Sequence, residues 1–317
     1  MKAVGVWEYG GPEALQVVEL PDPEPGAGEV LIRVHAVAVN PTDTLLRAGA
    51  HAARLAGVAP PYRPGMDAAG VVEALGAGVP DRLRVGQSVI ALVLPTGPHG
   101  GTYAERIVVP AESVVAAPAG ADLAAAATLL MNAMTARAAL DELALRPGQA
   151  LAVTGAAGAF GGYAVQLAKA DGLRVIADAS VADEKLVHTL GADDVVARGD
   201  DVADRIRELE PAGVPGLADG AVFNERALPA VADGGRLATV RFWSGEAPRG
   251  ITVHPVLVSS RADDTAALER LSRQAEEGVL TLRVAEVLPA AEAERAHRLL
   301  AAGGIRGRLV LDFTQPL

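Results

Sequence analysis

The chain has 317 residues, of which 50% are hydrophobic and 21% are charged, and it contains no cysteine. Its length fits about two domains, and its apolar content suffices for a folded core, which excludes disorder of the whole chain. Without cysteine there are no disulfides, thiolate zinc sites, iron–sulfur clusters or cysteine nucleophile. The net charge of −11 disfavours nucleic acid as a partner. No apolar run reaches about 18 residues and no signal-peptide pattern is present, so we expect no membrane span and a cytoplasmic protein.

Roughly the first 120 residues are predicted to be rich in β-structure. Short β-branched runs bounded by Gly, Pro or Asp predict strands at 30–40, 70–75, 88–94 and 103–109. One short helix is expected between them, from Thr42 or Asp43 to about Gly49.

Strands and helices alternate from Pro118 onward. Predicted strands at 150–154, 174–177, 194–196 and 236–240 are separated by predicted helices at 159–171, 183–190 and 202–209. Such alternation predicts a doubly wound parallel sheet with helices on both faces. The chain then continues with a helix at 263–277, a strand at 283–288, a helix at 290–302 and a last strand at 308–311. We therefore expect an α/β protein in three segments, 1–118, 119–257 and 258–317.

The strongest chemical signal is the glycine-rich stretch Leu151–Gly162, where a predicted strand runs directly into a turn that opens a helix. Small residues in such a turn let the backbone approach a pyrophosphate, and the amino end of the helix provides N–H donors and partial positive charge. Ala156 stands at the first glycine position of the usual GxGxxG pattern, followed by Gly158 and Gly161. We predict dinucleotide binding here; the alternative is a tight turn that binds no ligand.

The choice between NAD and NADP depends on the residue that faces the adenosine ribose. Asp178 lies about 20 positions after the turn, where an acidic residue would bind the ribose hydroxyls and favour NAD. Because side chains alternate along a strand, Ala179 faces the opposite way. If Ala179 faces the ribose, space is open for a 2′-phosphate, and Ser180, Lys185 and Arg198 could supply donors and charge. Each of these three could equally be an ordinary exposed residue.

Several short motifs follow one another along nearly the whole chain. They include VNPTD at 39–43, PGMDAAGVV at 64–72, GTYAE at 101–105, LRPG at 145–148, LGAD at 190–193, DGGR at 233–236, AH at 296–297 and GRLV at 307–310. In this order and spacing they resemble the medium-chain dehydrogenase/reductase superfamily, and most closely its zinc-free quinone oxidoreductase branch. The resemblance implies a GroES-like, β-rich catalytic domain made of the first and last segments, with a Rossmann domain between them. It also implies NADPH as cofactor, a small-molecule substrate and, by analogy, a homodimer.

The resemblance lets the zinc ligands of related alcohol dehydrogenases be checked by position. Their two cysteines and one histidine correspond to Asn40, Met66 and Met131 in this sequence. Since an amide and two thioethers do not make a normal zinc site, we expect no zinc. Without a Lewis acid to stabilise an alkoxide, the resemblance favours substrates that stabilise charge themselves, namely quinones or α,β-unsaturated carbonyls.

The resemblance also suggests residues for the reaction. The Asn40 amide would orient the cofactor and donate to a substrate carbonyl, and Asp43 is a second catalytic candidate that could instead only cap the short helix. His51 would protonate a reduced product, unless it is an ordinary loop residue. The cofactor-binding candidates are Asn40, Thr135, Gly155, Ala156, Gly158, Ala159, Phe160, Gly161, Ser180, Lys185, Arg198, Ala221, Val222, Arg241, Phe242 and Arg308. The substrate candidates are Tyr62, Asn132, Trp243 and His254, each of which could instead only pack.

The sequence thus predicts a zinc-independent, NADPH-dependent reductase of quinones or α,β-unsaturated carbonyls. A pathway-specific enoyl reductase and a non-catalytic NADPH-binding sensor or structural protein are the alternatives. Two departures from the branch concern the cofactor: Lys185 comes later than the usual lysine, and Arg198 replaces a usual tyrosine. Either Arg198 holds the 2′-phosphate, or the preference for NADP is weaker than usual.

Overall fold

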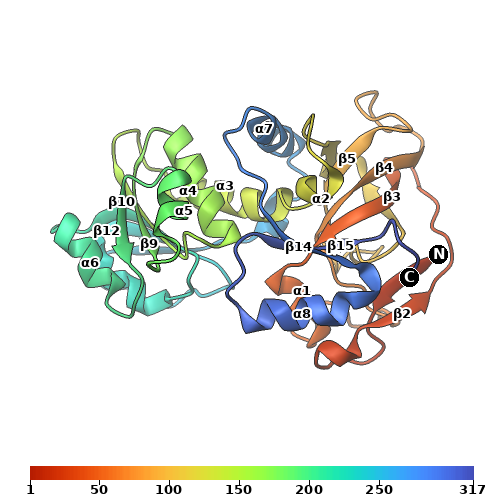
Figure 1. Ribbon diagram of the computed structural model, residues 1–317, viewed down its shortest axis with the longest axis horizontal. Helices are drawn as coiled ribbons and strands as arrows, with labels where there is room; N and C mark the ends of the chain where they lie inside the picture. Colours follow the sequence, from red (N-terminus) through yellow and green to blue (C-terminus); the bar gives the residue numbers. More distant parts are fainter. The chain divides into compact units, whose positions relative to one another are not determined.

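The computed structural model describes residues 1–317 and divides the chain into two compact units. The sheet-rich unit consists of Met1–Met131, Ala262–Glu277 and Leu282–Leu317, and the parallel-sheet unit of Asn132–Arg261 and Gly278–Thr281 (Figure 1). The predicted boundary at residue 118 stays a prediction; in the structure, helix α2 (Leu123–Ala126) packs on strands of the sheet-rich unit, whose first segment runs to Met131. The parallel-sheet unit extends past the predicted boundary at residue 257 to Arg261, which pairs with Asp141.

The sheet-rich unit is built on a seven-stranded sheet in the order β14-β15-β3-β4-β5-β7, with β6 paired to β3. All its pairings are antiparallel except that of β14 with β15. The strands are β3 (Glu29–Ala38), β4 (Asp67–Leu75), β5 (Ser88–Leu92), β6 (Arg106–Pro110), β7 (Val114–Ala116), β14 (Val284–Pro289) and β15 (Arg308–Asp312). A small two-stranded sheet of β1 (Lys2–Gly5) and β2 (Gln16–Glu19) accompanies it. The helices are α1 (Pro41–Arg47), α2, α7 (Thr265–Glu276) and α8 (Ala293–Ala302).

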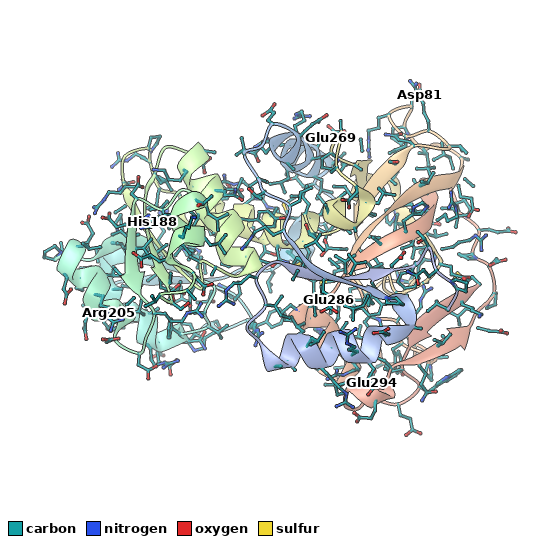
Figure 2. The ribbon with its side chains drawn as sticks, in the orientation of Figure 1. Asp81, His188, Arg205, Glu269, Glu286 and Glu294 are labelled. Atoms are coloured by element: carbon teal, nitrogen blue, oxygen red, sulfur yellow. The ribbon has the colours of Figure 1, made fainter.

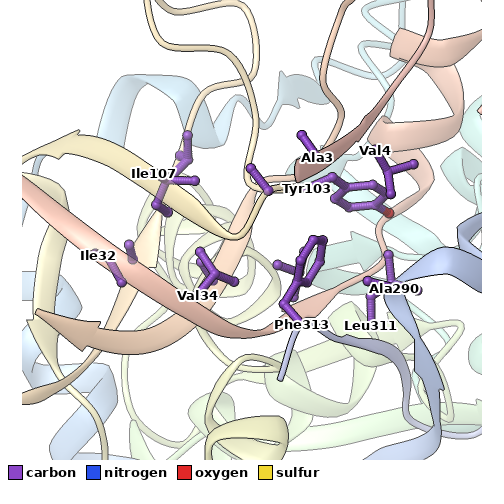
Figure 3. Packing of buried hydrophobic residues seen from close by; sticks show 14 of the residues in the cluster. Ala3, Val4, Ile32, Val34, Tyr103, Ile107, Ala290, Leu311 and Phe313 are labelled. Atoms are coloured by element: carbon purple, nitrogen blue, oxygen red, sulfur yellow. The ribbon is translucent and has the colours of Figure 1, made fainter. Parts of the chain in front are cut away.

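The core of this unit follows from alternation along its strands. Ile32 and Val34 on β3 point to the side of the sheet where Ile107, Leu311 and Phe313 pack with them (Figure 3). Between them in sequence, Arg33 is exposed, as the two-residue period of a strand requires.

The parallel-sheet unit contains six parallel strands in the order β10-β9-β8-β11-β12-β13. They are β8 (Ala150–Thr154), β9 (Arg174–Ala179), β10 (Asp194–Ala197), β11 (Val214–Asp219), β12 (Val231–Thr239) and β13 (Thr252–Pro255). The helices are α3 (Leu130–Leu143), α4 (Ala159–Ala170), α5 (Glu184–Thr189) and α6 (Val202–Leu209). The chain starts at β8, builds outward to β10, and then returns to add β11 on the other side of β8. In a doubly wound sheet, ligands bind outside the carboxyl ends of the strands at this reversal.

The predicted doubly wound sheet and the β-rich unit are both confirmed. Strands β1, β2, β7, β11 and β13 and helices α2 and α3 were not predicted from the sequence. One helical stretch, Leu123–Leu143, is long and apolar enough to cross a membrane by length and composition, with a mean hydropathy of 1.3, although no such stretch was expected. Because Arg137 interrupts the apolar run, the high mean hydropathy of the whole stretch was not recognised from the sequence. Most of the stretch, 78% of its 18-residue window, is buried, as in a core helix.

Charged side chains lie mainly at the surface. Glu286 on β14 and Glu294 on α8 are labelled in Figure 2, and they pair with Arg295 and Arg298 at 2.8 and 2.7 Å. Exposed pairs of this kind contribute little to stability.

Candidate active site

The glycine-rich turn after β8 requires glycine at two positions because the backbone approaches other backbone there. Gly155 has a φ of +66°, and a Cβ on it would lie 2.8 Å from the carbonyl carbon of Gly220. A Cβ on Gly161 would lie 2.3 Å from the carbonyl oxygen of Gly155 and 2.7 Å from Cα of Ala156. Gly158 is less restricted, with 3.1 Å to the same oxygen. Helix α4 is therefore held directly against the turn, and its amino end opens at the carboxyl edge of β8.

The carboxyl ends of β8 and β11 are fastened together by a buried carboxylate. The Thr154 hydroxyl donates to Oδ1 of Asp219 at 2.7 Å, and the Asn224 N–H donates to its Oδ2 at 2.7 Å. The Ala221 N–H in turn donates to the Thr154 hydroxyl at 3.3 Å. These bonds fix the turn and the segment after β11 side by side, at the point where the strand order reverses.

Asp178, near the end of β9, faces the glycine-rich turn. Its Oδ1 accepts a hydrogen bond from the Ala156 N–H at 3.2 Å, and its side chain is fully buried. Ala179 is 2% exposed and lies on the opposite face of the strand, away from the contact between Asp178 and the turn. Burial raises the pKa of Asp178, while the Ala156 amide and Arg198 oppose that rise.

The three residues predicted to hold a 2′-phosphate differ in their surroundings. Arg198 directly follows β10 and is partly exposed, with its Nε 3.6 Å from Oδ2 of Asp178. Lys185 is exposed on α5. The Ser180 hydroxyl donates to Oδ2 of Asp183 at 2.6 Å, so its proton is already used within the turn that precedes α5.

The loops after β11 and β12 start from neighbouring positions, because Asp219 lies opposite Thr239 in the sheet. Four of the six non-glycine residues with positive φ are in these loops, namely Val222, Asn224, Arg241 and Phe242. A β-branched residue such as Val222 rarely adopts that conformation, and such strain gathers at functional sites. Phe242 is 47% exposed, whereas Trp243 packs on the core and its carbonyl accepts from the Thr239 hydroxyl at 2.6 Å.

Three further candidates lie elsewhere in the parallel-sheet unit. Asn132 and Thr135 are buried on α3, and His254 lies on the outer strand β13. Nδ1 of His254 is 3.0 Å from a carboxylate oxygen of Glu142 on α3. The roles predicted for Asn132, Thr135 and His254 stay predictions.

In the sheet-rich unit, Asn40 links β3 to α1 and is fully buried. Its Nδ2 donates to the Ala38 carbonyl at 3.2 Å and to Oδ2 of Asp67 at 2.9 Å, and its Oδ1 accepts from Arg308 at 2.6 Å. The prediction that the amide donates to a substrate carbonyl is not supported, since both Nδ2 hydrogens are already used. Asn40 instead joins β3 to Asp67 and Arg308.

Arg308 is buried rather than available for cofactor phosphates. Its guanidinium donates to the carbonyls of Thr128 and Val39 at 3.3 and 3.0 Å, and lies 3.4 Å from Oδ2 of Asp67. The predicted phosphate contact therefore conflicts with the geometry. Asp67, whose Oδ1 accepts from the Met131 N–H at 2.8 Å, is the counter-ion of this buried cation.

Asp43 begins a second buried chain of hydrogen bonds. Its Oδ2 accepts from the Asn40 N–H at 2.8 Å and from the Tyr103 hydroxyl at 3.1 Å, and its Oδ1 accepts from the Gly65 N–H at 3.1 Å. Capping of α1, the alternative that the sequence left open, is therefore present. Burial raises the pKa of Asp43 to about 7.

The chain continues from Tyr103 through His297 to Arg47. Nε2 of His297 lies 3.1 Å from the Tyr103 hydroxyl, and its Nδ1 lies 3.2 Å from Nη1 of Arg47. Because the guanidinium can only donate, Nδ1 is the acceptor, and we assign the ring proton to Nε2. Burial and the neighbouring Arg47 charge lower the pKa of His297 to about 3.

The position of the zinc ligands in related alcohol dehydrogenases does not suit a metal in this chain. Met66 and Met131 are buried, and the Thr42 hydroxyl donates to the Met66 sulfur at 3.1 Å. The only hard donor of the three, Oδ1 of Asn40, is 2.6 Å from the Arg308 guanidinium, whose positive charge would repel a zinc ion.

The remaining two candidates lie away from these networks. His51 is half-buried in the loop after α1, and burial lowers its pKa. Tyr62 stacks on Tyr9 with ring centroids 4.9 Å apart, and its hydroxyl donates to the Val58 carbonyl. The structure thus gives Tyr62 a packing contact, and it tests neither predicted role.

Asp67, Tyr103 and His297 were not among the predicted site residues. All three stand within motifs quoted above, at 64–72, 101–105 and 296–297. A polar residue inside an otherwise apolar or glycine-rich motif was the signal that could have identified them.

Comparison with known proteins adds to this geometry. The sequence model of the alcohol dehydrogenase GroES-like domain matches residues 26–119, and that of zinc-binding dehydrogenases matches residues 190–311. A quinone oxidoreductase of Pseudomonas aeruginosa is 32% identical over 326 aligned residues, which cover 96% of this chain and 97% of that protein. A quinone oxidoreductase of Rattus norvegicus is 35% identical, but the match covers 62% of this chain and 58% of the relative. A mycobacterial protein solved with NADPH is similar in structure, with a TM-score of 0.85, 30% identity, and coverage of 98% of this chain and 100% of that one.

Proposed function

Because the chain belongs to the quinone oxidoreductase branch of the medium-chain dehydrogenase/reductase superfamily, we propose that it is a zinc-independent, NADPH-dependent reductase of quinones or α,β-unsaturated carbonyls. The alternatives are a reductase dedicated to one enoyl intermediate and a protein that binds NADPH without turnover. All three require a dinucleotide site, and they differ in what accepts the hydride.

The glycine-rich turn at the reversal of the strand order is the observation that carries the proposal. A Cβ at Gly155 or Gly161 would overlap backbone atoms of neighbouring segments, so these glycines let the turn pack closely against the amino end of α4. A close glycine-rich turn that runs from a parallel strand into the amino end of a helix is the arrangement that binds a pyrophosphate in dinucleotide sites. The relative solved with NADPH supports the choice of a pyridine nucleotide.

The residues around this turn fit the rest of a dinucleotide. Arg198 and Lys185, which carry positive charge at the edge of β9 and β10, would hold the adenosine end. The strained loops that contain Val222 and Arg241 would hold the nicotinamide end. When bound, the reduced nicotinamide supplies the hydride, and the protein supplies orientation and electrostatics.

The proposal of zinc independence is based on the charged groups around Asn40 in the sheet-rich unit. Arg308 provides a fixed cation against Asn40 and Asp67, where related alcohol dehydrogenases place a metal ligand. Asp67 and the Asn40 oxygen are therefore neutralised and hydrogen-bonded by the protein itself. Without a metal to stabilise an alkoxide, the acceptor must delocalise the incoming charge, as quinones and enones do.

A flat acceptor also suits the side chains near the turn. Phe223, with the Arg226 guanidinium 5.0 Å from its ring centroid, follows β11, and the exposed Phe242 follows β12. Aromatic rings bind flat molecules through large contact areas at fixed geometry.

The test is oxidation of NADPH by the metal-analysed protein with 1,4-benzoquinone, 9,10-phenanthrenequinone, a 2-enal and a long-chain enone, each with and without EDTA. We expect oxidation with at least one quinone or enone, unchanged by EDTA. Tight NADPH binding without turnover on any of the four would instead favour the pathway-specific enzyme or the non-catalytic protein. Chelator-sensitive oxidation of a simple alcohol with NADP would refute the proposal.

A further inference from the structure

A buried carboxylate oxygen beside the dinucleotide turn has no hydrogen-bond donor. Oδ1 of Asp178 accepts from the Ala156 N–H, but Oδ2 is buried and unpartnered. Leaving a charged oxygen buried without a donor is costly, so such atoms mark places where a ligand completes the site. Because Ala156 belongs to the turn, the carboxylate is aimed at the place where the adenosine half of a dinucleotide would lie.

The Arg198 guanidinium forms a long ion pair with this oxygen. Nε of Arg198 is 3.6 Å from Oδ2, which is beyond hydrogen-bond distance, and the Arg198 side chain is 41% exposed. Its backbone N–H donates to the Ala179 carbonyl at 2.7 Å, so the residue itself is fixed beside β9 while its side chain stays partly exposed. The guanidinium therefore offsets the negative charge of Asp178 without donating a hydrogen bond to Oδ2.

We infer that Asp178 and Arg198 form one ribose subsite with two modes, so that the protein accepts NADH as well as NADPH. The inference rests on the proposed dinucleotide site. In the first mode the ribose 2′-hydroxyl of NADH donates to Oδ2 of Asp178, which gives that oxygen the donor it lacks. In the second mode Arg198 turns to the 2′-phosphate of NADPH, which it can bind with two N–H groups.

The other nearby groups do not replace this pair. The Ser180 hydroxyl proton is used by Asp183, and Ala179 faces away from the turn. Lys185 is exposed on α5 and has a longer, more flexible side chain, so it can add charge to the second mode but leaves Oδ2 without a donor. The two modes also compete, because a phosphate brought near the buried carboxylate is repelled unless Arg198 lies between them.

The test is titration of NADH and of NADPH, without acceptor, by nucleotide fluorescence against the wild type, Asp178→Asn, Arg198→Ala and the double variant. Asp178→Asn removes the charge with little change of shape and is expected to weaken NADH binding about tenfold, the size of one charge-assisted hydrogen bond. The same variant is expected to leave NADPH binding unchanged or tighter. Arg198→Ala is expected to weaken NADPH binding about tenfold or more and to change NADH binding less than twofold.

The matched control is the ion pair that joins the same two strands at their opposite ends. Arg174 on β9 pairs with Asp194 on β10 at 2.7 Å, so Arg174→Ala and Asp194→Asn remove equal charges far from the carboxyl edge. We expect neither control to change the ratio of the two affinities. Thermal melting will show whether Asp178→Asn folds. If it does not, the ratio of the NADH and NADPH affinities of Arg198→Ala tests the inference alone.

Two results would overturn the inference. One is a wild type that binds NADPH at least a thousandfold more tightly than NADH, and the other is a parallel loss of both affinities in both variants. A wild type that binds neither nucleotide would refute the proposed function itself, which distinguishes the two failures.

Discussion

Asp43 and His297 are expected to make the stability of the sheet-rich unit depend on pH in opposite directions. Burial raises the pKa of Asp43 from 3.8 to about 7 and lowers that of His297 from 6.5 to about 3. Both side chains contact the Tyr103 hydroxyl, so they belong to one buried chain. Removing either one is therefore expected to expose the pH dependence of the other.

The sign of each contribution follows from which state holds the proton more tightly. Folded Asp43 holds its proton more tightly than unfolded Asp43, so its contribution is present below pH 3.8 and is lost as the pH rises to about 7. Folded His297 resists protonation, so its contribution is present above pH 6.5 and is lost as the pH falls to about 3. At about 1.4 kcal/mol per pH unit, the totals are roughly 4 and 5 kcal/mol. Between about pH 4 and 6.5 the two slopes nearly cancel.

The assay is urea unfolding at pH 4.5, 5.5 and 6.5 in a Trp243→Phe background, where Trp7 reports on the sheet-rich unit. Relative to the wild type, Asp43→Asn is expected to lose about 1.4 kcal/mol of unfolding free energy for each pH unit lowered. His297→Gln is expected to lose about the same for each pH unit raised. Tyr103→Phe keeps both titrating groups and is expected to lower stability at every pH with little change of slope.

The reasoning fails if both variants keep the wild-type slope or if both slopes change in the same direction. Either result would mean that the two groups are not held by burial in the protonation states given above. A variant that is less stable by the same amount at all three pH values says nothing about these protonation states, because losing any buried hydrogen-bond partner has that effect.

Three further changes test the site. Gly161→Ala places a Cβ 2.3 Å from the Gly155 carbonyl oxygen, so it should lower the free energy of unfolding by roughly 1–3 kcal/mol and abolish tight NADPH binding in a fluorescence titration. Gly158→Ala, with 3.1 Å to the same oxygen, is the control and should have a much smaller effect. Equal effects of the two variants would contradict the packing given for α4. Arg308→Met leaves the Asp67 carboxylate buried without its cation and should lower the unfolding free energy by about 3–5 kcal/mol in urea, with an unchanged value as the contrary result. Thr154→Val removes the hydroxyl that ties Asp219 to β8 and should cost about 1–3 kcal/mol in thermal or urea unfolding; a neutral effect would mean that the bond is not needed.

Local patterns were enough to predict the parallel-sheet unit. The strand at 150–154 and the helix at 202–209 agree with β8 and α6 residue for residue, because an apolar run and a 3.6-residue period are properties of neighbouring residues. Helix α3 was missed since it is buried on nearly all sides and therefore shows little periodicity. The small strands β1 and β13 are four residues long, too short for a clear pattern.

The direction of Asp178 shows where sequence reasoning stops. Counting from the turn placed an acidic residue near the ribose, and alternation showed that Asp178 and Ala179 face opposite ways. Which of them faces the turn depends on the phase of β9 relative to β8, and that phase is set by the pairing of the two strands. The contact with the Ala156 amide decides it.

The buried networks of the sheet-rich unit lay beyond the sequence for a different reason. Tyr103 and His297 are 194 positions apart, and Asn40 and Arg308 are 268 positions apart. Nothing local indicates that such residues meet, because only the folded sheet brings β3 and β15 together. For the same reason Asn40 was predicted to donate to a substrate carbonyl, although its Nδ2 donates to the Ala38 carbonyl and to Asp67.

The most direct test of the proposed zinc-independent reductase is one rate measured on one sample. The sample is purified protein whose zinc content has been determined by elemental analysis, and the rate is that of NADPH oxidation with the best acceptor of the panel. The account predicts less than about one zinc per ten chains and an equal rate after dialysis against EDTA, because Arg308 supplies the charge at the metal position. Stoichiometric zinc, with activity that EDTA removes and zinc restores, would contradict it.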